Sequence, residues 1–404
     1  GENDPVLRAA RANRDATIEN EPLARSQLLP QVNLSGDLNY AHQDIKNSPN
    51  GSFNDDFSTQ AAAVQVVQPL YRKDRLVQLE QARDQSEQAD VDYLGAQQDL
   101  ILRVADAYFS VLSAQDTLTF AQAEKAAIAR QLDQAKQRFE VGLIAITGVH
   151  EAQARFDQAR ADEISASNAV DNAFEALLRI TGQPVESLDQ LRSEIPLTSP
   201  QPATLEAWSD TALQNNPGVL SARINAEIAR KQIRFREAGG YPTFDLVGSY
   251  GIARSDADFG TDADTGSIGV QLRLPLYTGG RVTSGTRQAR FEYEAAQERL
   301  EERRRVVQNQ VRDAYRGVLT SISRVDALAA AQVSAQSALE ATEAGFEVGT
   351  RTLVDVLNSQ RDLFRARRDF AQARYDYILN TLSLMQAAGT LAPEDIQDVN
   401  TWLQ

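Results

Sequence analysis

The stretch FEVGTRTLVDVLN, residues 346–358, decides the fold because a near copy, FEVGLIAITGVHE, occupies residues 139–151. Three further pairs follow the same order: PLYRKDR (69–75) with PLYTGGR (275–281), VADAYFSVL (104–112) with VRDAYRGVL (311–319), and LLPQVNLSGDLNY (28–40) with GYPTFDLVGSYGI (240–252). The paired segments lie 206 to 212 residues apart. This regular spacing predicts two structural repeats, each about half of the chain.

Each repeat is expected to hold a lead-in helix, two strands and a long helix. The stretch from Arg72 to Arg138 has no proline and one glycine, Gly95, and is rich in good helix formers. It predicts a single helix roughly 100 Å long. The lead-in helices are expected at about 3–28 and 204–239, the strands at about 31–41, 60–70, 243–253 and 267–276, and the second long helix at about 282–345.

The FEVG turn ends each long helix, and the chain then returns in a second helix. Gly142 and Gly349 suit the left-handed position just past a helix C-terminus. The tips of the two helical hairpins are expected near 139–147 and 346–352, and the return helices at about 147–181 and 353–388. Helices this long need partner helices along their length. We therefore divide the chain into a first repeat (1–190), a connector (191–203), a second repeat (204–390) and a C-terminal equatorial segment (391–404).

The expected strands are two-faced. In residues 31–40, Val32, Leu34, Leu38 and Tyr40 share one parity and polar residues share the other. An ordinary sheet with one face on a core and one in water has this pattern. The strand length of about ten residues, and the long, mostly acidic loops at 42–57 and 255–266, favour strands that cross an outer membrane. Four strands cannot close a barrel and open edges are not tolerated in lipid, so several copies would share one barrel.

Composition excludes several classes of function. The net charge of −15 argues against nucleic acid as a partner. Without cysteine there is no thiolate metal site or cysteine nucleophile, and two histidines, His42 and His150, cannot build a multi-histidine metal site. The segment GGRVTSGT (279–286) is similar to a phosphate loop but has Thr286 where the lysine is required. No apolar run approaches the ~18 residues of a membrane-spanning helix. We expect no enzyme, no metal site and no cofactor.

The segments LLPQVNL, DAYFSVL, RQLDQAKQRFEVGLIAIT and FEVGTRTLVDVLN resemble the TolC family of outer-membrane efflux and secretion channels, and the resemblance covers essentially the whole chain. It implies an α+β fold in which a homotrimer shares a twelve-stranded outer-membrane β-barrel, four strands per protomer, continuous with a long α-helical barrel across the periplasm of a Gram-negative bacterium. The implied partners are outer-membrane lipid, a periplasmic adaptor (membrane fusion protein) and an inner-membrane pump of the RND or ABC type.

The resemblance also implies roles for the two tips. Gly142, Leu143, Gly349 and Thr350 correspond to turns that bind the adaptor. Arg351 and Asp355 correspond to residues of the entrance gate, where three copies of Asp355 would form an acidic ring in the lumen. From the sequence itself a local role is also open, because Thr352 and Asp355 have capping-box spacing at the start of a helix.

Three gate positions depart from the family pattern. Asn358 stands where a second aspartate is usual, Phe346 where a tyrosine links the gate, and Gly148 where an aspartate faces Arg351. We expect an entrance with fewer polar links and less cation selectivity. The function implied is a passive exit duct for drugs, other small molecules or proteins in a tripartite efflux or type I secretion system. The alternative is an elongated coiled-coil scaffold with a small sheet and no channel.

Overall fold

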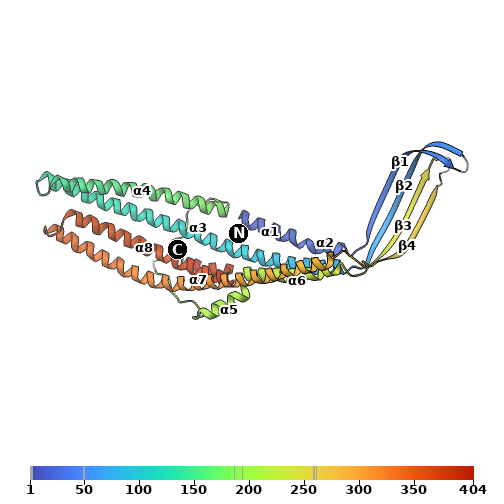
Figure 1. The fold of residues 1–404 in the computed structure, drawn as a ribbon. Helices are drawn as coiled ribbons and strands as arrows, with labels where there is room; N and C mark the ends of the chain where they lie inside the picture. The colour runs from blue at the N-terminus through green and yellow to red at the C-terminus, as the bar shows by residue number, and fades with distance from the viewer. Residues whose placement is uncertain (1–2, 49–50, 186, 193, 258–259, 261) are drawn as a thin grey trace. The chain divides into compact units, whose positions relative to one another are not determined.

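The computed structural model describes residues 3–48, 51–185, 187–192, 194–257, 260 and 262–404. Each repeat contains helices, two strands and a long helical hairpin, in the order expected (Figure 1). The first repeat consists of α1 (Pro5–Ile18), α2 (Asn20–Ser26), β1 (Gln31–Ser48), β2 (Gly51–Tyr71), α3 (Lys73–Glu140) and α4 (Ile146–Thr181). The second consists of α5 (Leu205–Asn215), α6 (Pro217–Ala238), β3 (Thr243–Ser255), β4 (Ala263–Arg273), α7 (Arg281–Glu347) and α8 (Leu353–Ala388), and α9 (Pro393–Asn400) follows.

The chain divides into two compact units, and several helices contribute to both. Unit 1 comprises residues 1–12, 91–220 and 302–404. Unit 2 comprises residues 13–90 and 221–301. The hairpin tips, the connector and the C-terminal segment belong to unit 1, and the sheet belongs to unit 2.

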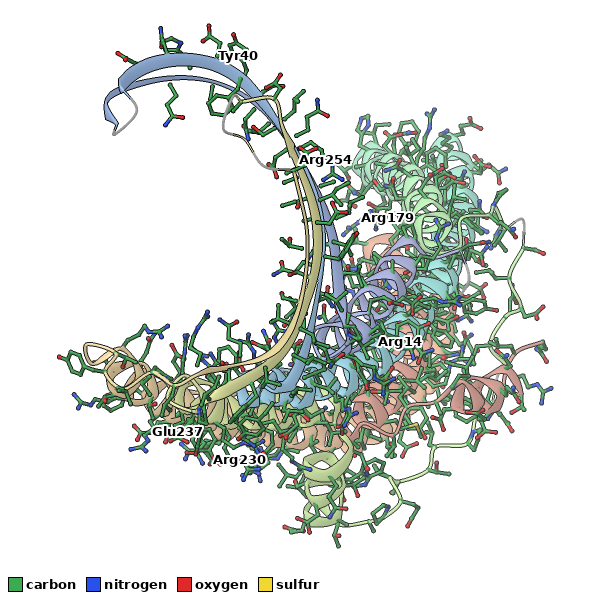
Figure 2. The ribbon with its side chains drawn as sticks, turned by 90° about the vertical axis from the view of Figure 1, so that its right-hand side faces the viewer. Arg14, Tyr40, Arg179, Arg230, Glu237 and Arg254 are labelled. Carbon is green, nitrogen blue, oxygen red and sulfur yellow. The ribbon has the colours of Figure 1, made fainter. Side chains whose placement is uncertain are left out.

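Unit 2 is built on one antiparallel sheet in the strand order β1-β2-β3-β4. The strands bend together into a curved sheet (Figure 2), as the right-handed twist of β-strands favours. The apolar parity is exposed: Leu34 is 77%, Leu38 is 75% and Ile268 is 80% accessible. One face of the sheet is therefore apolar and open, which is unlike a sheet that covers a water-soluble core.

The strands of the first hairpin are longer than the sequence predicted. We expected a loop over 42–57, but β1 and β2 pair from Gln31↔Val67 through Ile45↔Phe53 to Ser48↔Gly51. Residues 49–50 of that loop lie outside the described residues, as do 258–259 and 261 of the loop expected at 255–266. Strands pair through backbone hydrogen bonds, which do not depend on the side chains. The two strands therefore extend beyond the segment in which polar and apolar residues alternate, and the alternation alone could not show where they end.

An ion pair joins the sheet of unit 2 to the start of α3. The Arg72 guanidinium donates from Nε to Asp245 Oδ1 (3.0 Å) and from Nη2 to Oδ2 (2.6 Å), and Asp245 on β3 is 6% exposed. Within the same unit, Lys231 on α6 forms a 2.5 Å ion pair with Asp84 on α3. The Arg72–Asp245 pair fixes the point where β2 gives way to α3, because a bidentate pair restricts both side chains.

Unit 1 holds the tip-proximal parts of both hairpins, which lie side by side (Figure 1). One core cluster draws residues from three helices: Ile128, Leu132 and Ala135 of α3, Ala152 and Ala159 of α4, and Leu353 and Leu357 of α8. Tyr375 of α8 donates to Asp116 of α3 at 2.7 Å. None of the described helices carries an apolar stretch of the length that a bilayer crossing requires.

The lead-in helices are each broken, which the sequence analysis did not predict. We expected one helix over 204–239, but α5 ends at Asn215 and α6 begins at Pro217. Proline suits the first position of a helix, and Asn216 Oδ1 accepts hydrogen bonds from the amides of Gly218 (3.0 Å) and Val219 (3.3 Å). The first lead-in helix is likewise divided into α1 and α2.

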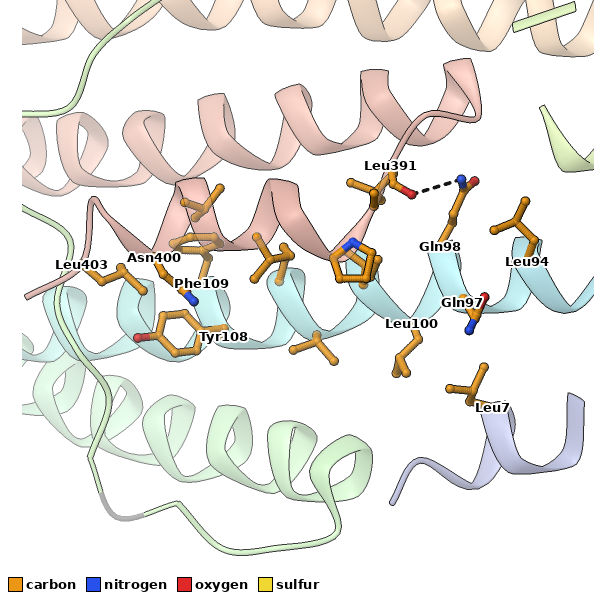
Figure 3. Close-up of a pocket in the computed structure, with 17 residues that line it drawn as sticks. Leu7, Leu94, Gln97, Gln98, Leu100, Tyr108, Phe109, Leu391, Asn400 and Leu403 are labelled. Atoms are coloured by element: carbon orange, nitrogen blue, oxygen red, sulfur yellow. Dashed lines mark hydrogen bonds between the residues drawn. The ribbon is translucent and has the colours of Figure 1, made fainter. Parts of the chain in front are cut away.

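The connector and the C-terminal segment pair within unit 1. Leu191 and Leu403 form an antiparallel bridge, with Gln190 N donating to Gln404 O at 2.9 Å. The segment around α9 borders an apolar cavity of about 530 Å³ that also contacts α1 and α3 (Figure 3). Gln98 of α3 closes one side by donating to the carbonyl oxygen of Leu391 at 3.1 Å.

Candidate functional site

The two hairpin tips have the same backbone geometry. At the first tip (residues 139–151), Gly142 has φ = 76°, Gly142 N donates to Phe139 O (2.9 Å) and Leu143 N donates to Arg138 O (2.8 Å). This pair of bonds is the Schellman motif, which satisfies the last carbonyls of a helix. The FEVG sequence therefore encodes a sharp helix end, and the left-handed glycine is what it requires.

The second tip (residues 346–358) repeats the motif. Gly349 has φ = 82°, Gly349 N donates to Phe346 O (3.2 Å) and Thr350 N donates to Gly345 O (2.8 Å). The left-handed geometry expected for both glycines is confirmed.

Both tips expose apolar side chains beside the glycines. Leu143 is 74% accessible, and so are its neighbours Val141 (70%) and, at the second tip, Val348 (76%). Sequence reasoning named Leu143 but missed the two valines, although each is the valine of an FEVG motif. Exposed apolar residues on a turn are poorly explained by folding of the chain alone, and are typical of a surface that another protein covers.

The start of α8 carries the expected capping box. Asp355 N donates to Thr352 Oγ1 (3.3 Å), and Asp355 Oδ2 accepts from Thr352 N (2.9 Å) and from Thr352 Oγ1 (2.8 Å). These hydrogen bonds, the backbone amide first, and the nearby positive charge of Arg351 lower the pKa of Asp355. Asp355 is therefore a capping residue, and it stays ionised at neutral pH.

Phe346 lies where the two hairpins meet. Its ring packs against the core cluster of α3, α4 and α8, and the Arg138 guanidinium carbon lies 4.3 Å from the ring centroid. This cation–π contact joins the end of α3 to the end of α7. The family's tyrosine hydroxyl is missing at this position, but a link between the hairpins is present, and sequence reasoning missed its partner, Arg138.

Asn358 also links the two hairpins. Arg155 of α4 donates from Nη2 to Asn358 Oδ1 of α8 at 3.1 Å. Sequence reasoning treated Asn358 only as a lost charge, and nothing in the sequence pointed to Arg155, which lies about 200 residues away. The amide oxygen accepts the hydrogen bond without the charge that an aspartate would bring.

Gly148 lies in the first turn of α4, and a Cβ added there would lie 3.5 Å from Cδ1 of Ile144, a side chain of the same tip. Arg351 is exposed at the second tip, where its backbone amide donates to Gly345 O at 3.1 Å. In the described part of the chain, no group of three or more histidine, aspartate or glutamate side chains is placed to hold a metal ion. The chemistry at the tips is thus that of weak polar links and exposed apolar residues.

The fold is that of an outer-membrane channel. In structure the chain is similar to the outer membrane protein VceC from Vibrio cholerae, with a TM-score of 0.83 at 19% identity, over 96% of this chain and 93% of that chain. In sequence it is 45% identical to outer membrane protein TolC of Vibrio cholerae, over 100% of this chain and 92% of that protein. It is 39% identical to outer membrane protein TolC of Escherichia coli, over 99% of this chain and 83% of that protein.

A model of the family described as outer membrane efflux protein matches residues 1–183 and again residues 208–390. The chain belongs to this family, whose model matches once in each half of the chain. It is an outer-membrane efflux and secretion channel of the TolC type, from a Gram-negative outer membrane and extending into the periplasm. Channels of this type are trimeric ducts that work with pump systems. The coiled-coil scaffold that we kept as an alternative is wrong.

Proposed function

We propose that the chain forms a homotrimeric, non-catalytic exit duct, through which an inner-membrane RND or ABC pump and a periplasmic adaptor pass their substrates to the exterior. The observation that carries this proposal is the sheet of unit 2. Its apolar face is open, and in the described chain β1 and β4 each pair with a strand on one side only. Joining β4 of one copy to β1 of the next would close a lipid-facing barrel without free edges.

The proposed adaptor surface consists of the exposed turns at both tips. Gly142, Leu143, Gly349 and Thr350 lie on these turns, and Val141 and Val348 extend the apolar surface. A Schellman turn fixes the direction in which these side chains project, because its backbone groups are already hydrogen-bonded. Such preorganisation lowers the entropy that binding must overcome.

The proposed gate is the set of links that holds the two hairpins of a protomer together near their tips. These links are the contact of Arg138 with Phe346 and the hydrogen bond from Arg155 to Asn358. A partly exposed cation–π contact contributes on the order of 0.5–1 kcal/mol, and a hydrogen bond to a charged group about 1.5–3 kcal/mol. Links of this size hold a closed entrance and still yield to the binding of an adaptor.

We further propose that Asp355 acts on the lumen as well as on its helix. Three ionised copies around an entrance would attract cations through their field. Arg351 next to each would reduce that attraction. Asn358 and Gly148 add no further carboxylates, so the ring contains three rather than the larger number of charges that an aspartate at either position would give.

Single-channel conductance in a planar bilayer tests the duct and the ring together. We expect discrete steps for the wild type, a weaker preference for cations in Asp355→Asn, and stronger sensitivity to divalent cations in Asn358→Asp. Asp157→Asn is the matched control, because Asp157 on α4 accepts a 3.1 Å bond from Gln153 within its own helix. If the conductance steps of both gate variants have the same ion selectivity and divalent sensitivity as the wild type, Asp355 acts only as a capping residue.

A variant with a weakened gate distinguishes a closed channel from the absence of a channel. Phe346→Ala removes the cation–π link and part of the tip core, so it should increase the open probability. If inserted trimers of both wild type and Phe346→Ala pass no current, the duct itself is refuted.

A further inference from the structure

Unit 2 contains a hollow of about 670 Å³ at the end of the sheet where strands give way to helices. Its walls come from the ends of β3 and β4, from α6, and from the first turns of α3 and α7. The proposed gate does not use this hollow, since the tips belong to unit 1.

The hollow concentrates positive charge. Four arginines line it, Arg72, Arg236, Arg273 and Arg281, against one carboxylate, Asp74. Arg72 is already held by both oxygens of Asp245. The other three are exposed, and in the described chain none has an ion pair or a side-chain hydrogen bond. Three guanidinium groups around one hollow repel each other, and an anion between them would relieve that repulsion.

The background charge does not explain this cluster. The chain as a whole carries −15, and acidic residues outnumber basic ones by 56 to 41. The three arginines also come from three different elements: Arg236 from α6, Arg273 from the end of β4, and Arg281 from the start of α7. Folding brings them together, and no basic run in the sequence does.

The hollow opens on the polar face of the sheet. Arg273 shares its parity with Ser267 and Gln271, whereas Val270 and Leu272 on the other parity are 62% and 57% exposed. Thr243, its partner across the ladder, also lines the hollow. In an outer-membrane channel the apolar face meets lipid, so the polar face and the hollow meet the aqueous interior.

The backbone at this point suits an anion as well. Gly279 and Gly280 have φ values of 59° and 82°, and α7 begins at Arg281. This is the segment GGRVTSGT, which lacks the lysine of a phosphate loop. Here guanidinium groups from α6 and β4 would supply the positive charge in its place, while Ser284, which also lines the hollow, offers a hydroxyl donor. The helix start adds to the arginine cluster and would not make a site without it.

We propose that this hollow is an anion-binding site on the wall of the duct, which holds small molecules bearing a phosphate, sulfate or carboxylate group. The inference rests on the proposed function, because only a duct gives the polar face a lumen. In a trimer the site would be present three times. Exposed arginines bind such groups bidentately but exchange them readily in water, which suits a transit site better than a storage site.

Binding of inorganic pyrophosphate to the full chain in detergent, measured by titration calorimetry, tests the site directly. The variant Arg236→Gln/Arg273→Gln/Arg281→Gln should bind more than about tenfold more weakly, since each removed guanidinium takes charge-assisted hydrogen bonds with it. The matched control Arg8→Gln/Arg11→Gln/Arg25→Gln removes the same charge from exposed positions on α1 and α2 and should bind like the wild type. Added salt should weaken wild-type binding.

Three results would overturn the proposal: no measurable pyrophosphate binding to the wild type, equal weakening in both triple variants, or loss of the trimer in the first variant alone. The last would show that the arginines join protomers. A bilayer measurement separates this inference from the duct. If the first triple variant gives conductance steps of normal size but a lower anion permeability, both the duct and the anion site are supported. If pyrophosphate binds but the channel conducts no current, the anion site is supported and its role in transport is refuted.

Discussion

The two hairpin tips share a backbone but not a set of side chains. Both end a long helix in a Schellman turn on a left-handed glycine. At the second tip Thr352 and Asp355 cap α8, but the equivalent positions of the first tip are Ala145 and Gly148, and α4 begins without a side-chain cap. The two repeats thus share the residues that the turn requires, but they differ in the residues at which the return helices begin.

The return helices differ in the same way. α4 and α8 each have 36 residues, but α4 buries three alanines and one leucine, whereas α8 buries large side chains such as Phe364, Tyr375 and Tyr377. α8 packs against both α4 and α5 and so lies at the centre of unit 1. Equal repeats have become one central and one peripheral hairpin, and the peripheral one leaves more surface for another protein chain.

The largest expected difference between the tips concerns their phenylalanines. Phe346 is half-buried under Arg138, but its counterpart Phe139 is 42% exposed. Phe346→Ala should lower the local unfolding free energy of the second tip by about 2 kcal/mol, below the cost at a fully buried site. Phe139→Ala should cost clearly less at the first tip. Hydrogen exchange of peptides from each tip measures both, and equal effects would contradict the asymmetry.

Substitution of the turn glycines should have the same effect at both tips. A Cβ at Gly142 or Gly349 meets no atom within 4 Å, so the cost of alanine there is that of the left-handed backbone alone. Gly142→Ala and Gly349→Ala should each destabilise their own tip by about 1–2 kcal/mol. Amide hydrogen exchange at the two turns measures both costs. A much larger cost for one substitution than for the other would contradict the expectation that the two turns are equivalent.

The caps can be exchanged between the tips. Thr352→Ala removes the side-chain acceptor for Asp355 N and should cost about 1 kcal/mol at the start of α8. The double substitution Ala145→Thr/Gly148→Asp installs a capping box at α4 and removes a helical glycine, so exchange in the first turn of α4 should slow. The single substitution Ala145→Val is the control, because valine has the shape of threonine and no acceptor. If valine protects as well as the pair does, capping is not the cause.

The smallest expected effect is a pH dependence that only the second tip has. The folded pKa of Asp355 lies below its ordinary value of 3.8. Its contribution to stability is therefore complete above the unfolded pKa and is lost as pH falls through the folded pKa. Exchange protection of residues 352–358, corrected for intrinsic rates, should drop below about pH 4. Asp355→Asn should remove this drop, and the first tip should not show it.

Much of the fold was predictable because its signals are local. The boundaries expected for α4 and α8 agree with the structure to within one residue, since both helices end at a left-handed glycine, Gly182 or Gly389, and α8 begins at the capping residue Thr352. The strand parity was equally plain. The predictions that were wrong concern the loop at 42–57 and the unbroken lead-in helices. Backbone pairing extends the strands into that loop, and Asn216 caps a new helix, α6, through the amides of Gly218 and Val219.

The candidate site was predictable only in part. Asp355 and the glycines act through atoms within a few residues, so spacing was enough to identify their local roles. Arg138, Arg155 and the arginines of the unit 2 hollow act through partners far away in the chain. With a single sequence, no periodicity or spacing relates such residues to each other.

The sequence by itself determined the repeat, the helical hairpins, their glycine turns and the two-faced strands, because each follows from dihedral preferences and from the alternation of polar and apolar residues. Only the tertiary structure decided that Phe346 lies under Arg138, that Arg155 reaches Asn358, that Arg72 is held by Asp245, and that α8 rather than α4 is central. Those contacts join segments roughly 170 to 210 residues apart, and their energies depend on distances that exist only once the chain has packed.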